Sequence, residues 1–371
     1  MRKVALDLGA RKTSYCEVQD GAVIRRATVT SVETLEFELG PKQTPAVVAI
    51  EACREAWHVH DLLTSWGNHV VLVDTTRSRR LGIGQHGRKT DRIDAEVLAL
   101  ALDRGGIPVA HVLSPHRREL RRQLSVRRAL VESRAQLITT ARGLAREQGA
   151  PVATCAVHHF ARHARKLDGN VRQLIEPLLN LLDTINAQLD TADTQLEKLC
   201  KTEPVVELLA SAPGVGPIIA ACFVSVIDDA KRFRSPHHVE SYVGLVPTED
   251  SSGGKRRLGA ISKKGNCYLR ALLVQGAWSI LRGKDRQDPL RLWADAVAAR
   301  RGKKIAVIAL ARRMVGVLWA MWRDGSPYDK ARLASASGRG TRQSANALDA
   351  HAKTMTLLAS KPPTTEAMLQ T

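Results

Sequence analysis

The sequence predicts an α/β domain followed by a mainly helical region. Over the first hundred residues, short apolar segments alternate with amphipathic ones, as strands and helices do in an α/β layer. Two long segments, 117–147 and 171–199, then carry apolar residues at helical spacing. We expect four regions, with the last forming a disordered tail because it is rich in Ala, Ser, Thr and Gly. Their predicted boundaries are 1–112, 113–202, 203–330 and 331–371.

The first region is expected to form a sheet of short strands. Apolar runs bounded by turn residues predict strands at 3–8, 13–18, 23–29, 46–50 and 70–73. The pair Asp20-Gly21 predicts a hairpin turn between the second and third of these. Helices are expected at 32–39, at 55–66 and from residue 91 onward.

Four acidic residues occupy positions that suit a metal site. Asp7 lies in the first strand, Glu51 ends a later strand, and Asp91 and Asp94 begin the following helix. Ligand sites in α/β sheets gather at the carboxyl ends of strands. Asp91 and Asp94 share a helix face and repel each other unless a cation such as Mg²⁺ lies between them. The alternatives are an ordinary helix cap at Asp91 and a structural ion pair at Asp7.

The charge balance predicts a polyanionic partner. The chain has 56 Lys and Arg against 37 Asp and Glu, a net charge of +19, which is typical of nucleic-acid-binding proteins. The six cysteines form no C-x-x-C pair, which argues against a zinc module or a disulfide framework and favours reduced thiols in the cytoplasm. We find no signal-peptide pattern and expect no membrane partner, so the protein is expected in the cytoplasm, on the nucleoid when bound to DNA.

The two long segments predict a helical stalk. Leu124, Val131 and Ile138 repeat every seven residues, which is typical of a coiled coil. The second segment continues an apolar stripe through Leu174, Leu178, Leu181, Ile185, Leu189, Ala192, Leu196 and Leu199. Pro177 within it predicts a kink or a helix start nearer Glu176. We therefore expect the stalk to be a helical hairpin or a dimerising element.

Several basic and glycine-rich positions are candidates for binding a nucleic-acid backbone. The turn around Gly214 and Gly216 between two helices has a helix-hairpin-helix pattern, which offers backbone N–H groups to phosphate. Arginines on the first stalk helix offer a cationic face, although a solvated face is the alternative. The full set of candidates outside the turn is Arg117, Arg118, Arg121, Arg122, Lys255, Arg256, Arg257, Lys263, Lys264 and Arg270.

Ser251 and Ser252 lie on a glycine-backed loop amid these cations. A serine hydroxyl becomes a useful nucleophile only when a base or metal activates it. Nearby cations can stabilise charge that develops on a phosphodiester. The alternative is a phosphate-binding loop without chemistry.

Taken in order, these motifs resemble those of the IS110/IS1111-type insertion-sequence transposases. The motifs are Val-Ala-Leu-Asp7, Ile-Glu51-Ala, Lys-Thr-Asp91-Arg-Ile-Asp94-Ala, Pro-Gly-Val-Gly-Pro, Gly-Leu-Val-Pro, Ser-Ser252-Gly-Gly-Lys and Ser-Lys-Lys-Gly-Asn-Cys-Tyr-Leu-Arg. The resemblance implies an RNase H-like, RuvC-like first domain. In it, Asp7, Glu51, Asp91 and Asp94 form a DEDD set that holds Mg²⁺ or Mn²⁺. It also implies a C-terminal transposase domain with its serine at Ser252, or at the adjacent Ser251.

The resemblance further implies a recombinase that cuts and rejoins DNA through a covalent serine intermediate. Its partners would be DNA of the element ends and target, a guide RNA from the element, and further copies of the chain as a dimer or tetramer. Two other functions stay open: a RuvC-like junction nuclease that uses water, and a non-catalytic nucleic-acid-binding protein. A nuclease has no need for Ser252, and a pure binder gains nothing from carboxylates near phosphates.

Overall fold

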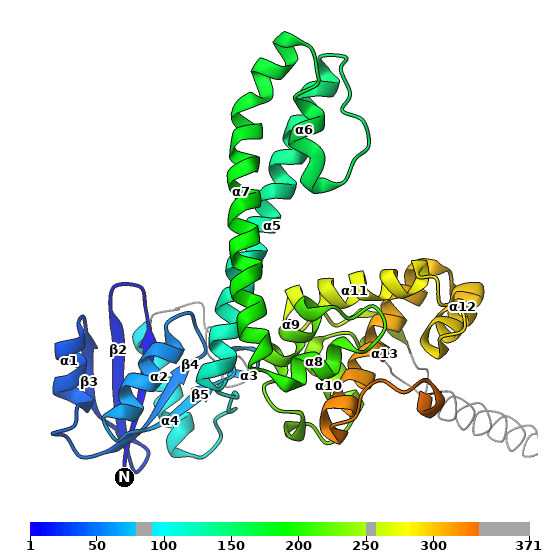
Figure 1. The fold of residues 1–371 in the computed structure, drawn as a ribbon. Coiled ribbons are helices and arrows are strands. Elements are labelled where there is room, and N and C mark those ends of the chain that lie inside the picture. Colours follow the sequence, from blue (N-terminus) through cyan, green and yellow to red (C-terminus); the bar gives the residue numbers. More distant parts are fainter. Residues whose placement is uncertain (79–90, 250–256, 334–371) are drawn as a thin grey trace, which may run out of the picture. The chain divides into compact units, whose positions relative to one another are not determined.

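The structure, a computed structural model, divides into two units, Met1–Leu113 and Ser114–Thr371. It describes residues 1–78, 91–249 and 257–333. The first unit is α/β and the second is mainly helical, as the sequence predicted (Figure 1). The predicted divisions at residues 202 and 330, within the second unit, stay predictions.

The first unit is built on a mixed five-stranded sheet with the strand order β3-β2-β1-β4-β5. The strands are β1 (Arg2–Leu8), β2 (Thr13–Gln19), β3 (Ala22–Val29), β4 (Ala46–Glu51) and β5 (His69–Val73). The first three are antiparallel, whereas β4 and β5 run parallel to β1. Asp20 and Gly21 both have positive φ, which is the geometry of the tight hairpin turn that the sequence predicted.

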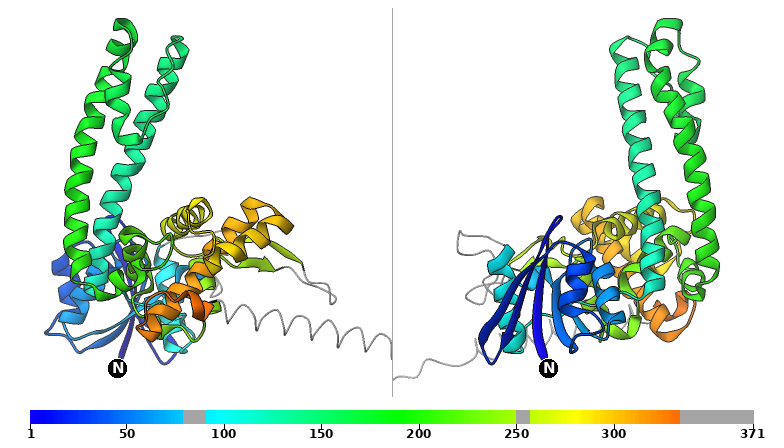
Figure 2. Two further views of the ribbon diagram at one scale, coloured as in Figure 1. Left: turned by 45° about the vertical axis from the view of Figure 1, so that its right-hand side comes forward. Right: turned by 90° about the vertical axis from the view of Figure 1, so that its left-hand side faces the viewer.

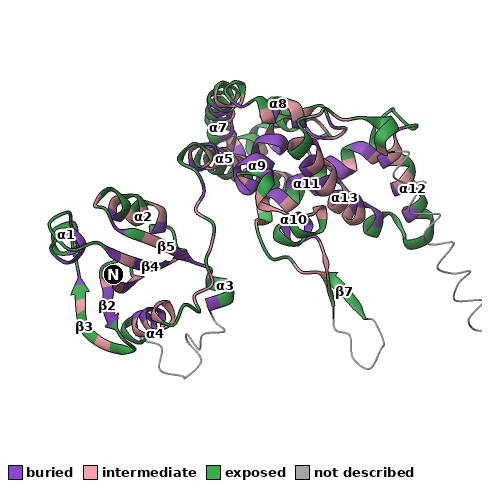
Figure 3. Cartoon of the chain, turned by 90° about the horizontal axis from the view of Figure 1, so that it is seen from below, coloured by how far each residue is buried: buried purple, intermediate pink, exposed green. Residues whose placement is uncertain are grey.

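Helices cover both faces of this sheet (Figure 3). The helices α1 (Val32–Leu39) and α2 (Ala56–Ser65) lie on one face, and α4 (Asp91–Asp103) lies on the other. A short helix, α3 (Thr75–Ser78), follows β5. Because side chains alternate along a strand, Val4 and Leu6 pack on the α1 and α2 side, and Ala5 packs on the α4 side.

The second unit begins with the predicted pair of long helices, which run side by side (Figures 1 and 2). They are α5 (Pro115–Glu147) and α7 (Gly169–Lys201), with η2 (Val157–His159) and α6 (Phe160–Ala164) between them in sequence. Pro177 lies inside a continuous α7, so the alternative start near Glu176 is wrong.

The buried face of α7 differs from the predicted stripe in its first half. Ile175, Leu179 and Leu182 are buried there, whereas Leu174 and Leu181 are 50% and 49% exposed. From Ile185 to Leu196 the predicted positions are the buried ones, and Leu199 is partly buried. The first half of α7 therefore carries a second apolar stripe that faces away from the hairpin.

The rest of the second unit packs around α9 (Pro217–Ile227), which is buried from Ile219 to its end. The surrounding elements are α8 (Pro204–Ala210), η3 (Ala230–Arg232), α10 (Pro236–Val243), β6 (Pro247–Glu249), β7 (Leu258–Ile261), α11 (Cys267–Arg282), α12 (Pro289–Arg301) and α13 (Lys303–Asp324). By length and composition alone, α13 could cross a membrane, but half of its apolar window is buried inside the fold. Packing in this core therefore accounts for its apolar residues.

Candidate active site

Strand register places two of the four predicted acids at equivalent positions on neighbouring strands. In the parallel pair of β1 and β4, Leu6 lies opposite Ile50, so Asp7 and Glu51 follow at matching positions. Asp7 shares the strand face of Ala5, and Glu51 shares that of Ala49. Both alanines belong to the buried cluster that packs against α4. The two acids therefore lie on the face that α4 covers.

The helix α4 adds Asp94 to this face. The Asp94 side chain is only 6% exposed, and its neighbour Ala95 is buried in the same cluster as Ala5 and Ala49. Asp91 is the first residue of α4, but its side chain lies outside the described part of the structure. The fold thus brings Asp7, Glu51 and Asp94 to one face, and the meeting of all four acids stays a prediction.

A serine that the sequence did not single out positions Glu51. The hydroxyl of Ser78, in α3, donates a hydrogen bond of 2.8 Å to Glu51 Oε1. Ser78 is only 2% exposed, so this bond is shielded from water. In the sequence, Ser78 falls within a basic connector, where nothing marks it as a partner of an acid.

The donor chemistry suits a hard divalent ion. All four candidates offer carboxylate oxygens, which are the ligands that Mg²⁺ prefers. Among the described side chains, no three of His, Cys, Asp or Glu are close enough to hold a metal ion. The Asp91 side chain is not among them.

Two ion pairs fix α4 over the sheet. Lys3 Nζ lies 2.9 Å from Asp103 Oδ1 and joins β1 to the end of α4. Arg26 Nη2 lies 2.8 Å from Glu96 Oε2 and joins β3 to the middle of α4. The hydrogen bond from Lys3 lowers the pKa of Asp103, which favours the charged form of this carboxyl.

The arginines at the start of α5 divide into two groups. Arg118 is 3% exposed, and Arg117 forms an ion pair with Glu203, which also contacts His116. These contacts give both arginines a packing role at the base of the hairpin. Arg122 is exposed and lies 2.9 Å from Glu119, and Arg121 lines a cleft described below.

The glycine turn before α9 has a packing role at its first glycine. Gly214 has a φ of +69°, and a Cβ atom there would lie 2.4 Å from the carbonyl oxygen of Gly276 in α11. Only glycine permits this backbone contact. A Cβ atom on Gly216, which caps α9, would meet nothing within 4 Å. Phosphate binding at this turn stays a prediction.

The basic loop before α11 is held by backbone contacts and by Arg270. Arg270 Nη1 donates to the carbonyls of Val243, Lys264 and Gly265, at 3.1, 3.1 and 3.0 Å. Gly244 and Gly265 have positive φ, and a Cβ atom on either would collide with the facing backbone. Arg270 thus acts as an internal clamp beside the exposed Lys263 and Lys264, and its predicted contact with phosphate stays a prediction.

The predicted nucleophile lies outside the described residues, as do Lys255 and Arg256. The structure does describe both ends of this segment. The antiparallel strands β6 and β7 pair Glu249 with Leu258, so the ends of the segment that contains Ser251 and Ser252 are held together. Arg257 lies at its second end.

Comparison with known proteins gives matches over most of the chain. A DEDD transposase model of the IS110 group matches residues 4–148, and a model described as "Transposase IS116/IS110/IS902 family" matches residues 206–290. A Pseudomonas aeruginosa protein named "Probable family 20 transposase" is 30% identical over 286 residues, which cover 75% of this chain and 84% of that protein.

Two relatives are named for their insertion sequences. The transposase of IS1111A from Coxiella burnetii is 29% identical over 289 residues, covering 76% of this chain and 79% of the relative. The transposase of IS1328 from Yersinia enterocolitica is 25% identical over 337 residues, covering 88% of this chain and 98% of the relative. The similarity thus extends through both units.

Proposed function

Because the chain belongs to the IS110 family of insertion-sequence transposases, we propose that it cuts and rejoins DNA by using a serine nucleophile and a set of metal-binding acids. The observation that carries this proposal is that Asp7, Glu51 and Asp94 lie on one face of the sheet, within the residues that the DEDD transposase model matches. A non-catalytic binder would have no use for three acids on one face of the sheet, because carboxylates repel phosphates.

In this proposal the acids of the first unit hold the ion. Asp7, Glu51, Asp91 and Asp94 would bind Mg²⁺ or Mn²⁺ through carboxylate oxygens. A bound ion would stabilise negative charge on the oxygens of the reacting phosphate. The hydroxyl of Ser78 would keep one oxygen of Glu51 in place, which leaves the other oxygen for the ion.

The serine would carry the chemistry. Ser252 Oγ, or Ser251 Oγ, loses its proton and forms an ester bond with phosphorus, as the bond from phosphorus to the leaving deoxyribose oxygen breaks and that oxygen takes up a proton. Attack by a second DNA hydroxyl on the phosphoserine then rejoins the strands and frees the serine. Lys263 and Lys264, together with Lys255, Arg256 and Arg257, would hold the DNA backbone.

The same proposal includes the partners. The net charge of +19 supports binding of element-end and target DNA and of an element-encoded guide RNA. The outward stripe with Leu174 and Leu181 supports a coiled-coil contact with another copy of the chain, because exposed leucines at helical spacing are costly unless they are covered. The acids and the serine belong to different units, so they would meet in the assembled complex, within one chain or across subunits.

A trapping experiment tests the serine. The protein is incubated with end-labelled element-end DNA, denatured, and separated by electrophoresis to find label that migrates with protein. Ser252→Ala should lose this adduct and recombination together, and Ser251→Ala should keep both. If Ser251→Ala is the inactive variant, the nucleophile is Ser251 and not Ser252. If both variants recombine normally, the serine mechanism is wrong and the water-using nuclease replaces it.

A further inference from the structure

A cleft in the second unit lies between the first stalk helix and the clamped loop. Its volume is about 320 Å³, and its described lining comes from α5, α9 and residues 265–268. Arg121 and Arg128 stand on the α5 side, Asn266 and Tyr268 stand opposite, and Leu124 and Val226 belong to the apolar part. The cleft thus combines two cations on the α5 wall with an apolar part and with polar groups such as Ser225 and Asn266.

The cations of this cleft are arranged along one helix face. Arg121 and Arg128 are seven residues apart, which is two helical turns. The Arg128 guanidinium lies 5.1 Å from the centroid of the Tyr268 ring, and Arg128 Nε donates a 2.7 Å hydrogen bond to Glu132. An arginine held both by an aromatic ring and by a carboxylate presents its remaining N–H groups in a restricted direction, which suits a phosphate.

The opposite wall is fixed as well. The clamp formed by Arg270 holds Gly265 through its carbonyl, and the Asn266 side chain accepts a 2.9 Å hydrogen bond from Leu269 N at the start of α11. The Arg128 and Asn266 side chains are thus held in place before a ligand enters, which lowers the entropic penalty of binding.

Size and chemistry together indicate the ligand. A phosphate group alone would use the two arginines but leave the apolar part of the cleft unfilled, and a base pair of a duplex is too large to enter. A single nucleotide supplies both a phosphate for the arginines and a flat base for the apolar wall. We propose that this cleft binds one unpaired nucleotide of a nucleic-acid strand.

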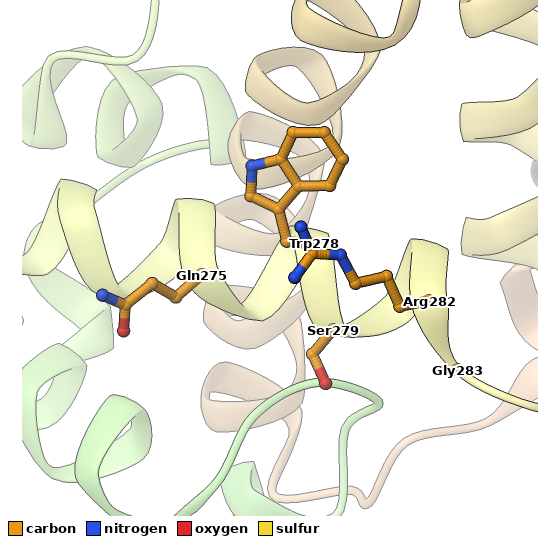
Figure 4. Close-up of a pocket in the computed structure, with 5 residues that line it drawn as sticks. All are labelled: Gln275, Trp278, Ser279, Arg282 and Gly283. Carbon is orange, nitrogen blue, oxygen red and sulfur yellow. The ribbon is translucent and has the colours of Figure 1, made fainter. Parts of the chain in front are cut away.

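A second hollow, on α11, gives less information about a ligand. Figure 4 shows Gln275, Trp278, Ser279 and Arg282 along α11, with the Arg282 guanidinium 5.0 Å from the Trp278 ring centroid. Among the described residues, its lining comes from α11 and the adjoining Gly283. It therefore offers no facing wall to define a ligand.

Competition binding tests the proposal on the full chain. A duplex with one unpaired nucleotide is compared with the same duplex fully paired, in DNA and in RNA. The unpaired form should bind roughly tenfold more tightly, as one stacked base allows. Ser125→Tyr, which places a ring inside the cleft, and Arg128→Gln, which removes a cation, should both abolish this preference. Ala129→Tyr, on an exposed part of α5 that does not line the cleft, should keep it.

This inference takes from the proposed function only that the partner is a nucleic acid. The outcomes of the experiment distinguish failure of the inference from failure of the proposed function. Equal binding of both duplexes by the unaltered protein overturns the cleft assignment, as does a preference that survives both Ser125→Tyr and Arg128→Gln. If Ser125→Tyr fails to fold, Arg128→Gln alone decides. Absence of binding to any duplex contradicts the nucleic-acid function itself. The DNA and RNA arms show which strand supplies the nucleotide.

Discussion

The acid face of the first unit and the basic loop of the second are positioned by different physical means. Asp7 and Glu51 take their places from the register of two parallel strands, which regular backbone hydrogen bonds maintain. Lys263 and Lys264 take theirs from Arg270 and from glycine contacts between segments distant in sequence. The first arrangement depends on a repeating pattern, whereas the second depends on a few individual contacts, so single substitutions should affect the two regions differently.

The largest expected effect tests the acid face. Asp94→Asn should lower the rate of DNA cleavage at least about a hundredfold, because removing one charge-stabilising group from an active site has effects of this size. DNA binding should change little, and the fold should stay intact because Asn is nearly isosteric. Cleavage of end-labelled DNA and filter binding measure the two properties separately.

Asp103→Asn is the matched control for this prediction. Asp103 is also an acid of α4, but it pairs with Lys3 at the other end of the helix. The Asp103→Asn variant should retain most of the cleavage activity. Equal loss of activity in both variants would mean that general charge on α4, and not Asp94, matters.

The second prediction concerns the basic loop before α11. In Gly244→Ala the added Cβ atom would lie 1.8 Å from the carbonyl oxygen of Lys264, so the loop must move. We expect a loss of about 3 kcal/mol in the free energy of unfolding, measured by urea titration. Gly325→Ala is the control, because Gly325 also has positive φ but has nothing near the added atom. It should cost about 1–2 kcal/mol, and equal losses would contradict the contact.

A third prediction concerns the sheet that carries the acids. Glu17 accepts hydrogen bonds from Arg2 (2.7 Å) and from the hydroxyl of Tyr15 (2.6 Å), and the bond from Arg2 lowers the pKa of Glu17 below its usual 4.5. A lowered pKa stabilises the folded state above pH 4.5, and this contribution is lost as the pH falls through the folded pKa.

Glu17→Gln should therefore reduce the free energy of unfolding by about 1–3 kcal/mol at neutral pH. The difference from the unaltered protein should shrink below the usual glutamate pKa. Urea titrations at neutral and acidic pH measure both values. Glu36→Gln, on an exposed position of α1, should show little change at either pH. A gap that widens as the pH falls would reverse the assigned sign.

The smallest expected effect concerns Ser78. Ser78→Ala removes the hydrogen bond to Glu51 and should slow cleavage about fivefold, in keeping with roughly 1 kcal/mol for one such bond. DNA affinity should not change. Ser78→Thr, which retains a hydroxyl, should recover part of the rate. An unchanged rate in Ser78→Ala would show that Glu51 needs no support from this hydroxyl.

Regular patterns made much of the first unit predictable from sequence. All five strands and the start of α4 lie within a residue or two of their predicted bounds, because apolar runs and turn residues are local signals. The common face of Asp7 and Glu51 follows from alternation along parallel strands. Ser78 was missed because its bond to Glu51 joins residues 27 positions apart, and no local pattern encodes that contact.

In the second unit, local sequence patterns did not fully predict which side chains are buried or which contacts they make. The predicted stripe of α7 is displaced by one position before Ile185, because leucine and isoleucine occur on adjacent faces there and only packing against α5 and α6 selects between them. The clamp role of Arg270 was missed because its three carbonyl partners, Val243, Lys264 and Gly265, come together only when the chain folds.

The matched register of β1 and β4 makes the length of these strands as important as their composition. Inserting or deleting one residue within either strand would turn the following acid to the opposite face of the sheet, even with every side chain retained. The exposed turn at Asp20-Gly21 has no such constraint, since it joins two strands that carry none of the four acids. Length variation among functional relatives should therefore gather in turns of this kind and spare the two acid-bearing strands.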